Sequence, residues 1–141
     1  MNEITLKAQK LIENAAYTII ASLDQAGYPN VKAMLPPRKH SGLSTFYFTT
    51  NTSSQRVSQY RKDPKASIYF CDSLYFKGLM LIGSMEVLED RQAKELIWRP
   101  GDELYYPLGV SDPDYCVLRF TAIKGHYYDN LRSYEVIIES P

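Results

Sequence analysis

The stretch Ser44–Arg56, STFYFTTNTSSQR, joins two local patterns that together decide the architecture. Its first half is built almost wholly from aromatic and β-branched residues, which is typical of a β-strand. Its second half brings small hydroxyl residues in front of helix-forming positions, which indicates a helix that begins where the strand ends. This helix is predicted to stop at Asp63-Pro64, because proline disfavours helical backbone in the residue before it.

Upstream of this stretch the sequence predicts a helix and a hairpin. Apolar residues at helical spacing follow Asn2, a residue suited to cap a helix, and predict an amphipathic helix up to about residue 15. Residues 17–23 (YTIIASL) and 29–35 (PNVKAML) are rich in strand formers, and a glycine-containing turn separates them. Residues 38–42, RKHSG, are predicted to be a polar loop.

Downstream the pattern remains that of short strands with few helices. Residues 66–70 and 78–88 are predicted strands, the second bent or bulged at Gly83, and residues 90–98 form a predicted helix. A loop rich in proline, glycine and tyrosine covers residues 100–114. Three further strand-like segments lie at residues 115–122, 123–129 and 134–138.

This order of elements defines the predicted fold class. Six or more strands in close succession, without alternation of strand and helix, favour a mainly β (α+β) fold: an antiparallel barrel with short covering helices. A parallel, doubly wound sheet is disfavoured. So small a barrel is filled by its own side chains, so a ligand is expected outside it, in a groove or at a subunit interface.

Composition limits the function classes. The chain has 141 residues, 45% of them hydrophobic, and residues 1–141 are predicted to form one domain. Its 16 basic residues are balanced by 16 acidic ones, which disfavours nucleic acid as the main partner. Two cysteines are too few for a disulfide framework, and no apolar run reaches the roughly 20 residues of a membrane span or resembles a secretory signal. We therefore expect a soluble, cytoplasmic protein that does not bind membranes.

The residues at the strand-to-helix junction have the chemistry of a phosphate site. A helix start offers unpaired amides and a partial positive charge, Thr50 and Ser54 offer hydroxyl donors, and Arg56 can bind a phosphate bidentately. Lys32 lies on a strand that would neighbour the aromatic strand in a meander, so its side chain could reach the same anion. The structural alternatives are a serine that only caps the helix, a solvated arginine and an outward-facing lysine.

The sequence resembles the pyridoxamine 5′-phosphate oxidases in several segments. Thr50-Asn51-x-x-Ser54-x-Arg56 is similar to their Thr-Asn-x-x-Ser-Arg-Lys element, and PNVKAML is similar to the strand before it. The segments KDPKASIYF, GSMEVLED, YPLGVSDPDYCVLRFTA and HYYD follow in the order of the short, stress-associated branch of this family. The resemblance covers about residues 5 to 130.

This resemblance implies a split β-barrel that forms a homodimer and binds FMN in grooves at the dimer interface. The positions that it assigns to the phosphate and ribityl chain are Lys32, Thr50, Ser54, Gln55 and Arg56. Those that it places around the isoalloxazine ring are Val31, Ala33, Met34, Phe48, Thr49, Trp98 and Tyr128. Trp98 and Tyr128 are expected from the partner subunit, and an anchor in the core or interface is the structural alternative for Trp98.

The departures from the family pattern bear on activity. Gln55 replaces a basic residue of the phosphate site, Gly78 falls where the oxidases have a glutamine near the flavin, and the C-terminal element that engages the vitamin substrate has no convincing counterpart. The resemblance thus implies an FMN-dependent oxidoreductase for another small molecule, with a reduced nicotinamide as a candidate electron donor. Efficient oxidation of pyridoxamine phosphate is not expected, and no catalytic side chain is assigned.

Two other functions remain open at this point. The chain could be a flavin carrier or sensor without a substrate, or a relative that uses haem or a deazaflavin. His126 would be the haem ligand, because some related split barrels bind haem through a histidine. Neither His126 nor His40 has nearby cysteine or carboxylate partners in the sequence, so a metal site is not predicted.

Overall fold

The computed structural model describes residues 2–72 and 74–139, and its secondary structure follows the sequence pattern closely. Helix α1 begins behind Asn2, whose side chain accepts a hydrogen bond from the Thr5 amide at 2.8 Å. The hairpin of β1 and β2 turns at Gly27, which has a φ of 87° that an L-residue rarely adopts. The predicted cap and hairpin are confirmed. The first elements are α1 (Glu3–Asn14), β1 (Thr18–Leu23), β2 (Pro29–Met34), β3 (Lys39–Ser41) and β4 (Thr45–Asn51).

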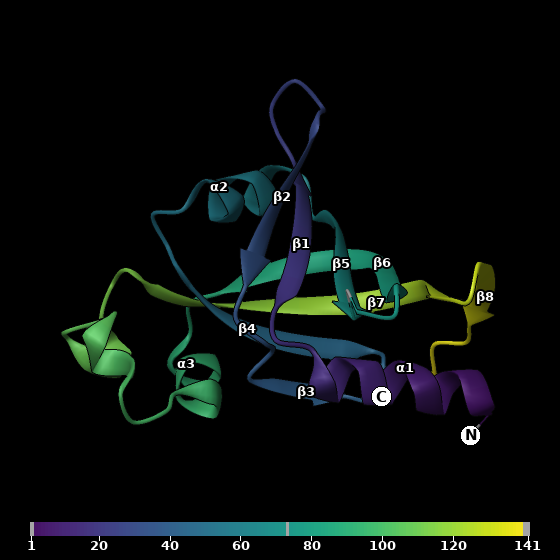
Figure 1. Ribbon diagram of the computed structural model, residues 1–141. Coiled ribbons are helices and arrows are strands. Elements are labelled where there is room, and N and C mark those ends of the chain that lie inside the picture. Colours follow the sequence, from purple (N-terminus) through teal and green to yellow (C-terminus); the bar gives the residue numbers. More distant parts are fainter. Residues whose placement is uncertain (1, 73, 140–141) are drawn as a thin grey trace.

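The later elements complete one eight-stranded antiparallel sheet within the described residues. They are α2 (Gln55–Lys62), β5 (Lys65–Asp72), β6 (Lys77–Leu88), α3 (Arg91–Ile97), the 3₁₀ turns η1 (Asp102–Leu104) and η2 (Gly109–Ser111), β7 (Tyr115–Asp129) and β8 (Arg132–Val136). The strand order is β2-β1-β5-β6-β7-β4-β3, and β8 pairs with the far end of β7. Figure 1 shows the sheet curled on itself, with α1 below it, α2 beside the β1–β2 hairpin and α3 at one end.

Two sequence predictions about strands need correction. Residues 38–42 were expected to be a loop, but Lys39–Ser41 form β3, which pairs with β4 at an edge of the sheet. Residues 115–122 and 123–129 were expected to be separate strands, but they form the single strand β7. The predicted irregularity at Gly83 is confirmed, because the register between β6 and β7 shifts between Ile82 and Gly83.

The core fills the barrel, as expected for one of this size. Its largest fully buried side chains include Phe46, whose ring packs against those of Phe70 and Phe120. A second, smaller cluster lies between α3 and the start of β7. The barrel interior therefore holds side chains, so a ligand must bind on its outside. None of the helices among the described residues is long and apolar enough to cross a membrane.

Candidate functional site

Helix α2 begins as the sequence predicted, with Ser54 as its cap. Ser54 has extended backbone, and its Oγ accepts a hydrogen bond from the Val57 amide at 3.4 Å. Val57 and Tyr60 are buried on the inner side of the helix, and the helix ends before Asp63-Pro64. The capping role proposed as the structural alternative for Ser54 is thus real. It is compatible with ligand binding, because a capping oxygen still has its own proton to donate.

Lys32 faces the side of the sheet on which α2 lies. It pairs with Ile20 of β1, and paired residues of antiparallel strands point to the same face. Ile20 is in the core, and α2 is fixed to the same strand because the Tyr60 hydroxyl donates to the Ala21 carbonyl at 2.9 Å. A further hydrogen bond joins Ser22 to Gln59. The exposed Lys32 therefore extends from β2 beside the helix that carries Arg56.

Arg56 has an unsatisfied hydrogen-bond donor at the start of α2. Its Nε atom is buried and has no hydrogen-bond partner within residues 2–72 and 74–139. Burial raises the pKa of the neighbouring Tyr60, and the positive charge of Arg56 opposes part of this rise. A buried guanidinium N–H without an acceptor is costly by about 1–3 kcal/mol, and an anion at the helix start would supply that acceptor.

A second unsatisfied group lies close to the proposed ring-binding strand. Thr18 is fully buried, and its hydroxyl has no hydrogen-bond partner among the described residues. It pairs with Met34 at the end of β2. Two buried polar groups without partners thus lie on elements adjoining β2, whereas buried polar groups in proteins are nearly always hydrogen-bonded. The residues present fit a ligand with a phosphate and further polar atoms.

The remaining predicted positions divide into those near the junction and those far from it. Thr50 is buried near the end of β4, while Val31 and Ala33 lie exposed on β2, at the sheet edge. Thr49 is half-buried, Gln55 is exposed, and the Phe48 side chain is enclosed in the core with 1% exposure. Phe48 can therefore lie near a ligand but cannot offer its ring to one without repacking.

Trp98 and Tyr128 lie at opposite ends of the 15-residue strand β7. Trp98 packs against Tyr115 with ring centroids 5.2 Å apart, and Tyr115 pairs with Asn51 at the junction end of β4. Tyr128 lies at the opposite end of β7, opposite Gly78 of β6. The core-anchor alternative thus describes Trp98 in a single chain. Contact of either residue with a flavin remains a prediction that requires a second copy.

Gly78 leaves room that another side chain fills. A Cβ built at Gly78 on β6 would collide with the hydroxyl of Tyr69, a residue of the neighbouring strand β5. Tyr69 is partly exposed, and burial raises the pKa of its phenol. A tyrosine hydroxyl from the next strand therefore fills the space beside Gly78, the position at which the resemblance implies a glutamine in the oxidases.

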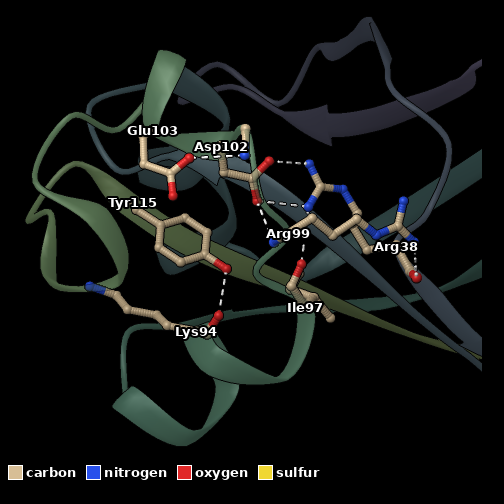
Figure 2. A network of polar contacts seen from close by, with 8 residues as sticks. Arg38, Lys94, Ile97, Arg99, Asp102, Glu103 and Tyr115 are labelled. Carbon is tan, nitrogen blue, oxygen red and sulfur yellow. Dashed lines mark hydrogen bonds and ion pairs between the residues drawn. The ribbon is translucent and has the colours of Figure 1, made fainter.

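An ion pair that the sequence did not reveal fixes the loop after α3 (Figure 2). Arg38 donates to both carboxylate oxygens of Asp102 at 2.8 Å and to the Ile97 carbonyl at 3.0 Å. The Arg99 amide also donates to Asp102, at 2.9 Å. These donors, Arg38 foremost, lower the pKa of the Asp102 carboxyl. The sequence placed Asp102 and Arg38 in two separate predicted loops, and only the structure shows that the two side chains meet.

The fold and this junction define an antiparallel split β-barrel with a candidate phosphate site outside the barrel. The chain belongs to the pyridoxamine 5′-phosphate oxidase family, whose model matches residues 4–129. No curated protein matches the chain. No group of three or more histidine, cysteine, aspartate or glutamate side chains is placed to hold a metal ion within the part of the chain that the structure describes.

Solved structures place the chain in the general stress branch of the family. A protein from Clostridium acetobutylicum, related to general stress protein 26 of B. subtilis, is 42% identical, with a TM-score of 0.88 over 96% of this chain and 95% of that one. General stress protein 26 from Bacillus anthracis shares the fold at 15% identity, with a TM-score of 0.76 over 96% of this chain and 100% of that one. A heme binding protein from Mycobacterium smegmatis also shares it at 15% identity, with a TM-score of 0.77 over 96% of this chain and 58% of that one.

Proposed function

We propose that this protein binds FMN and, with the flavin bound, acts as an oxidoreductase on a small molecule. The observation that carries the proposal is the unsatisfied, buried Nε of Arg56 in the first turn of α2. Lys32, on the face of the sheet that carries α2, would supply a second cation. A phosphate there would accept from Arg56, Ser54 and the helix amides. The flavin would supply the electron transfer, and the protein would supply binding and orientation.

The phosphate site predicts a strong preference for FMN over riboflavin, which lacks the phosphate. We expect FMN to bind at least about 10-fold more tightly, because hydrogen bonds to a charged group are worth about 1.5–3 kcal/mol. Titration of the apoprotein with each flavin, followed by the quenching of flavin fluorescence, measures this ratio. Equal affinities would show that the protein does not recognise the phosphate. No binding of excess FMN would refute the proposed FMN site altogether.

We also propose that a second copy of the chain covers the outer face of the sheet beside β2. This face carries an apolar groove of about 350 Å³, with Ala21, Pro29 and Ile82 among its lining residues. Val31 and Ile123 are each 72% exposed near it, on β2 and β7. Exposed apolar surface of this kind marks interaction sites in soluble proteins. A homodimer would bury it and could bring the partner's aromatic side chains to the flavin.

Replacing Ile123 with glutamate tests this interface. A charge in a buried interface is strongly unfavourable, so Ile123→Glu is expected to shift the protein from dimer to monomer at micromolar concentration. Sedimentation velocity measures the change. The matched control is Leu6→Glu, at an exposed apolar position of α1 that is 54% exposed and does not line the groove. A wild-type protein that sediments as a monomer would contradict the proposal.

Haem is the second candidate ligand, and one arrangement favours it. His126 and Met80 are paired residues of β7 and β6, both half-buried, and histidine and methionine hold the haem iron of cytochromes c. A Soret band that is lost in His126→Ala would support haem. A yellow protein that releases FMN, is bleached by a reduced nicotinamide and recovers with an added acceptor would support the flavin oxidoreductase.

A further inference from the structure

A polar groove on the outer face of the sheet has no part in the proposed flavin site. It crosses the adjacent strands β3, β4, β7 and β6 and has a volume of about 430 Å³, within the range of roughly 300–1,000 Å³ that small-molecule sites occupy. Its described lining residues do not include those proposed to bind the phosphate, and none of them lines the apolar groove proposed for the homodimer. The groove is therefore a separate candidate binding site.

The register of the strands places one row of charged and phenolic side chains across this groove. Lys39 pairs with Tyr47, and Tyr47 pairs with Arg119. Arg119 in turn pairs with Glu86. Paired residues of antiparallel strands point to the same face, and all four side chains line the groove. Tyr47 is thus flanked by two cations, one on each neighbouring strand.

A second row across the groove carries hydroxyl groups. Ser41 pairs with Thr45, and Thr45 pairs with Thr121. All three residues line the groove, and each lies two positions from a member of the charged row on its own strand. Residues two apart on a strand share a face and are separated by roughly 7 Å. A ligand that spans the groove would therefore meet charged groups on one side and hydroxyl groups on the other.

The charged row has one positive charge in excess. Glu86 accepts from Nε of Arg119 at 3.1 Å and from Nη2 at 2.9 Å, so one cation is already paired. The ammonium of Lys39 forms no ion pair with any residue that the structure describes. One carboxylate would neutralise the groove, whereas a doubly charged phosphate would leave it negative. The charge balance therefore favours a ligand with a single carboxylate.

Two of the donors are held in place by the protein itself. The bidentate pair with Glu86 orients the guanidinium of Arg119 and uses only two of its five N–H donors. The ring of Tyr47 packs against the smaller buried cluster between α3 and β7, so the hydroxyl end of the ring is positioned as well. Groups that are already ordered lose less conformational entropy when a ligand binds.

We propose that this groove binds a small hydroxy acid, a molecule with one carboxylate and several hydroxyl groups. The carboxylate would lie over Tyr47, within reach of Lys39 and of the remaining donors of Arg119. The hydroxyl groups of the ligand would bond to the second row, which begins at Thr45 and its two neighbours. The inference does not depend on the proposed flavin site, because the two sites use different residues.

The test compares three probes of equal chain length on the full-length protein at low ionic strength. Gluconate carries a carboxylate and hydroxyl groups, sorbitol has the hydroxyl groups without the carboxylate, and hexanoate has the carboxylate without the hydroxyl groups. Shifts of the backbone amide resonances of β3 and β4, followed by NMR, measure the affinities. We expect gluconate to bind at least about tenfold more tightly than sorbitol and about threefold more tightly than hexanoate, because hydrogen bonds to charged groups are the stronger ones.

Two variants test the two rows separately. Lys39→Gln removes the unpaired ammonium at an exposed position and is expected to weaken gluconate binding at least about fivefold. The matched control is Lys124→Gln, at an exposed lysine of β7 that does not line the groove, and it should change the affinity less than twofold. Thr45→Val keeps the shape and strand propensity of the side chain, and it should weaken gluconate binding about threefold without changing hexanoate binding.

Four results would each overturn the proposal. Equal affinities for gluconate and sorbitol would show that the groove does not recognise a carboxylate. Equal affinities for gluconate and hexanoate would show that the hydroxyl row does not take part. Equal losses in the two lysine variants would show that the probes respond only to the overall charge of the protein. No amide shifts in β3 and β4 with any probe would refute the site itself.

Discussion

Replacing Asp102 with alanine is expected to lower the free energy of unfolding by about 3–5 kcal/mol, because it leaves the Arg38 guanidinium as a buried charge without its partner. The side chains of the two residues are only 12% and 7% exposed, for Arg38 and Asp102 respectively. The carboxylate also accepts from the Arg99 amide, which would lose its partner as well. Thermal unfolding followed by circular dichroism should show a midpoint lower by about 10–17 °C.

The matched control is a second bidentate pair on the outer surface of the sheet. Arg119 donates to both carboxylate oxygens of Glu86, but their side chains are 36% and 49% exposed. Glu86→Ala is expected to cost less than about 1 kcal/mol, because water screens an exposed pair and solvates what remains. Equal losses of stability in the two variants would show that burial does not set the strength of the Asp102 pair.

The same carboxylate predicts a loss of stability in acid. The pKa of Asp102 is lowered in the folded state, chiefly by its hydrogen bonds with Arg38, so unfolding raises it toward the ordinary value of about 3.9. The ionised Asp102 carboxylate contributes fully to the free energy of unfolding at pH values above that ordinary pKa. This contribution is lost as the pH falls through the lower pKa of the folded state. Urea unfolding of the wild type and of Asp102→Ala, measured over a range of pH, should give free energies of unfolding that converge below about pH 4. A difference that stays constant down to pH 2 would contradict this assignment.

Replacing Arg56 with alanine is expected to weaken FMN binding by about 1.5–3 kcal/mol, or roughly 10- to 150-fold, the range for hydrogen bonds to a charged group. The apoprotein should lose no stability, because Nε of Arg56 has no hydrogen bond to lose within residues 2–72 and 74–139 and its removal relieves the cost of an unsatisfied buried donor. The weaker binding should therefore appear in the FMN titration and as a smaller FMN-dependent rise of the melting temperature. The melting temperature of the apoprotein should not fall.

Arg61 is the control for Arg56, because it lies on the same helix at an exposed position. Its guanidinium pairs with Glu89, and its side chain is 47% exposed. Arg61→Ala is expected to change FMN affinity less than twofold. A loss of affinity in Arg56→Ala alone would then be due to the position of Arg56 and not to the removal of a positive charge from α2. An Arg56→Ala variant that binds FMN as tightly as the wild type would refute the phosphate assignment.

Local sequence patterns were enough to predict most of the fold. The cap at Asn2, the turn at Gly27 and the helix end before Asp63-Pro64 each depend on residues close in the chain, and each is present in the structure. The strand β3 was missed because its polar residues resemble a loop. They form a strand because β4, a few residues later, offers an edge with which they can pair.

The candidate site was predictable from the sequence where its residues lie close together in the chain. Ser54 and Arg56 follow one another in the sequence, so a strand end and a helix start identified them together. Lys32 required the assumption that its strand lies close by, and the structure places it on the face beside α2. The Arg38–Asp102 pair joins residues in separate loops that no periodicity connects, so the sequence offered no signal for it.

The pairing of β4 has a consequence for how the protein acquires its ligand site during synthesis. The strand that precedes the phosphate site is hydrogen-bonded to β3 and to β7, and its last residue, Asn51, pairs with Tyr115. At roughly 5–20 residues per second, a ribosome needs about 3–13 s to add the intervening chain. The junction proposed to bind the flavin therefore completes its strand pairing only after β7 has emerged, and we expect capture of the proposed cofactor to follow that step.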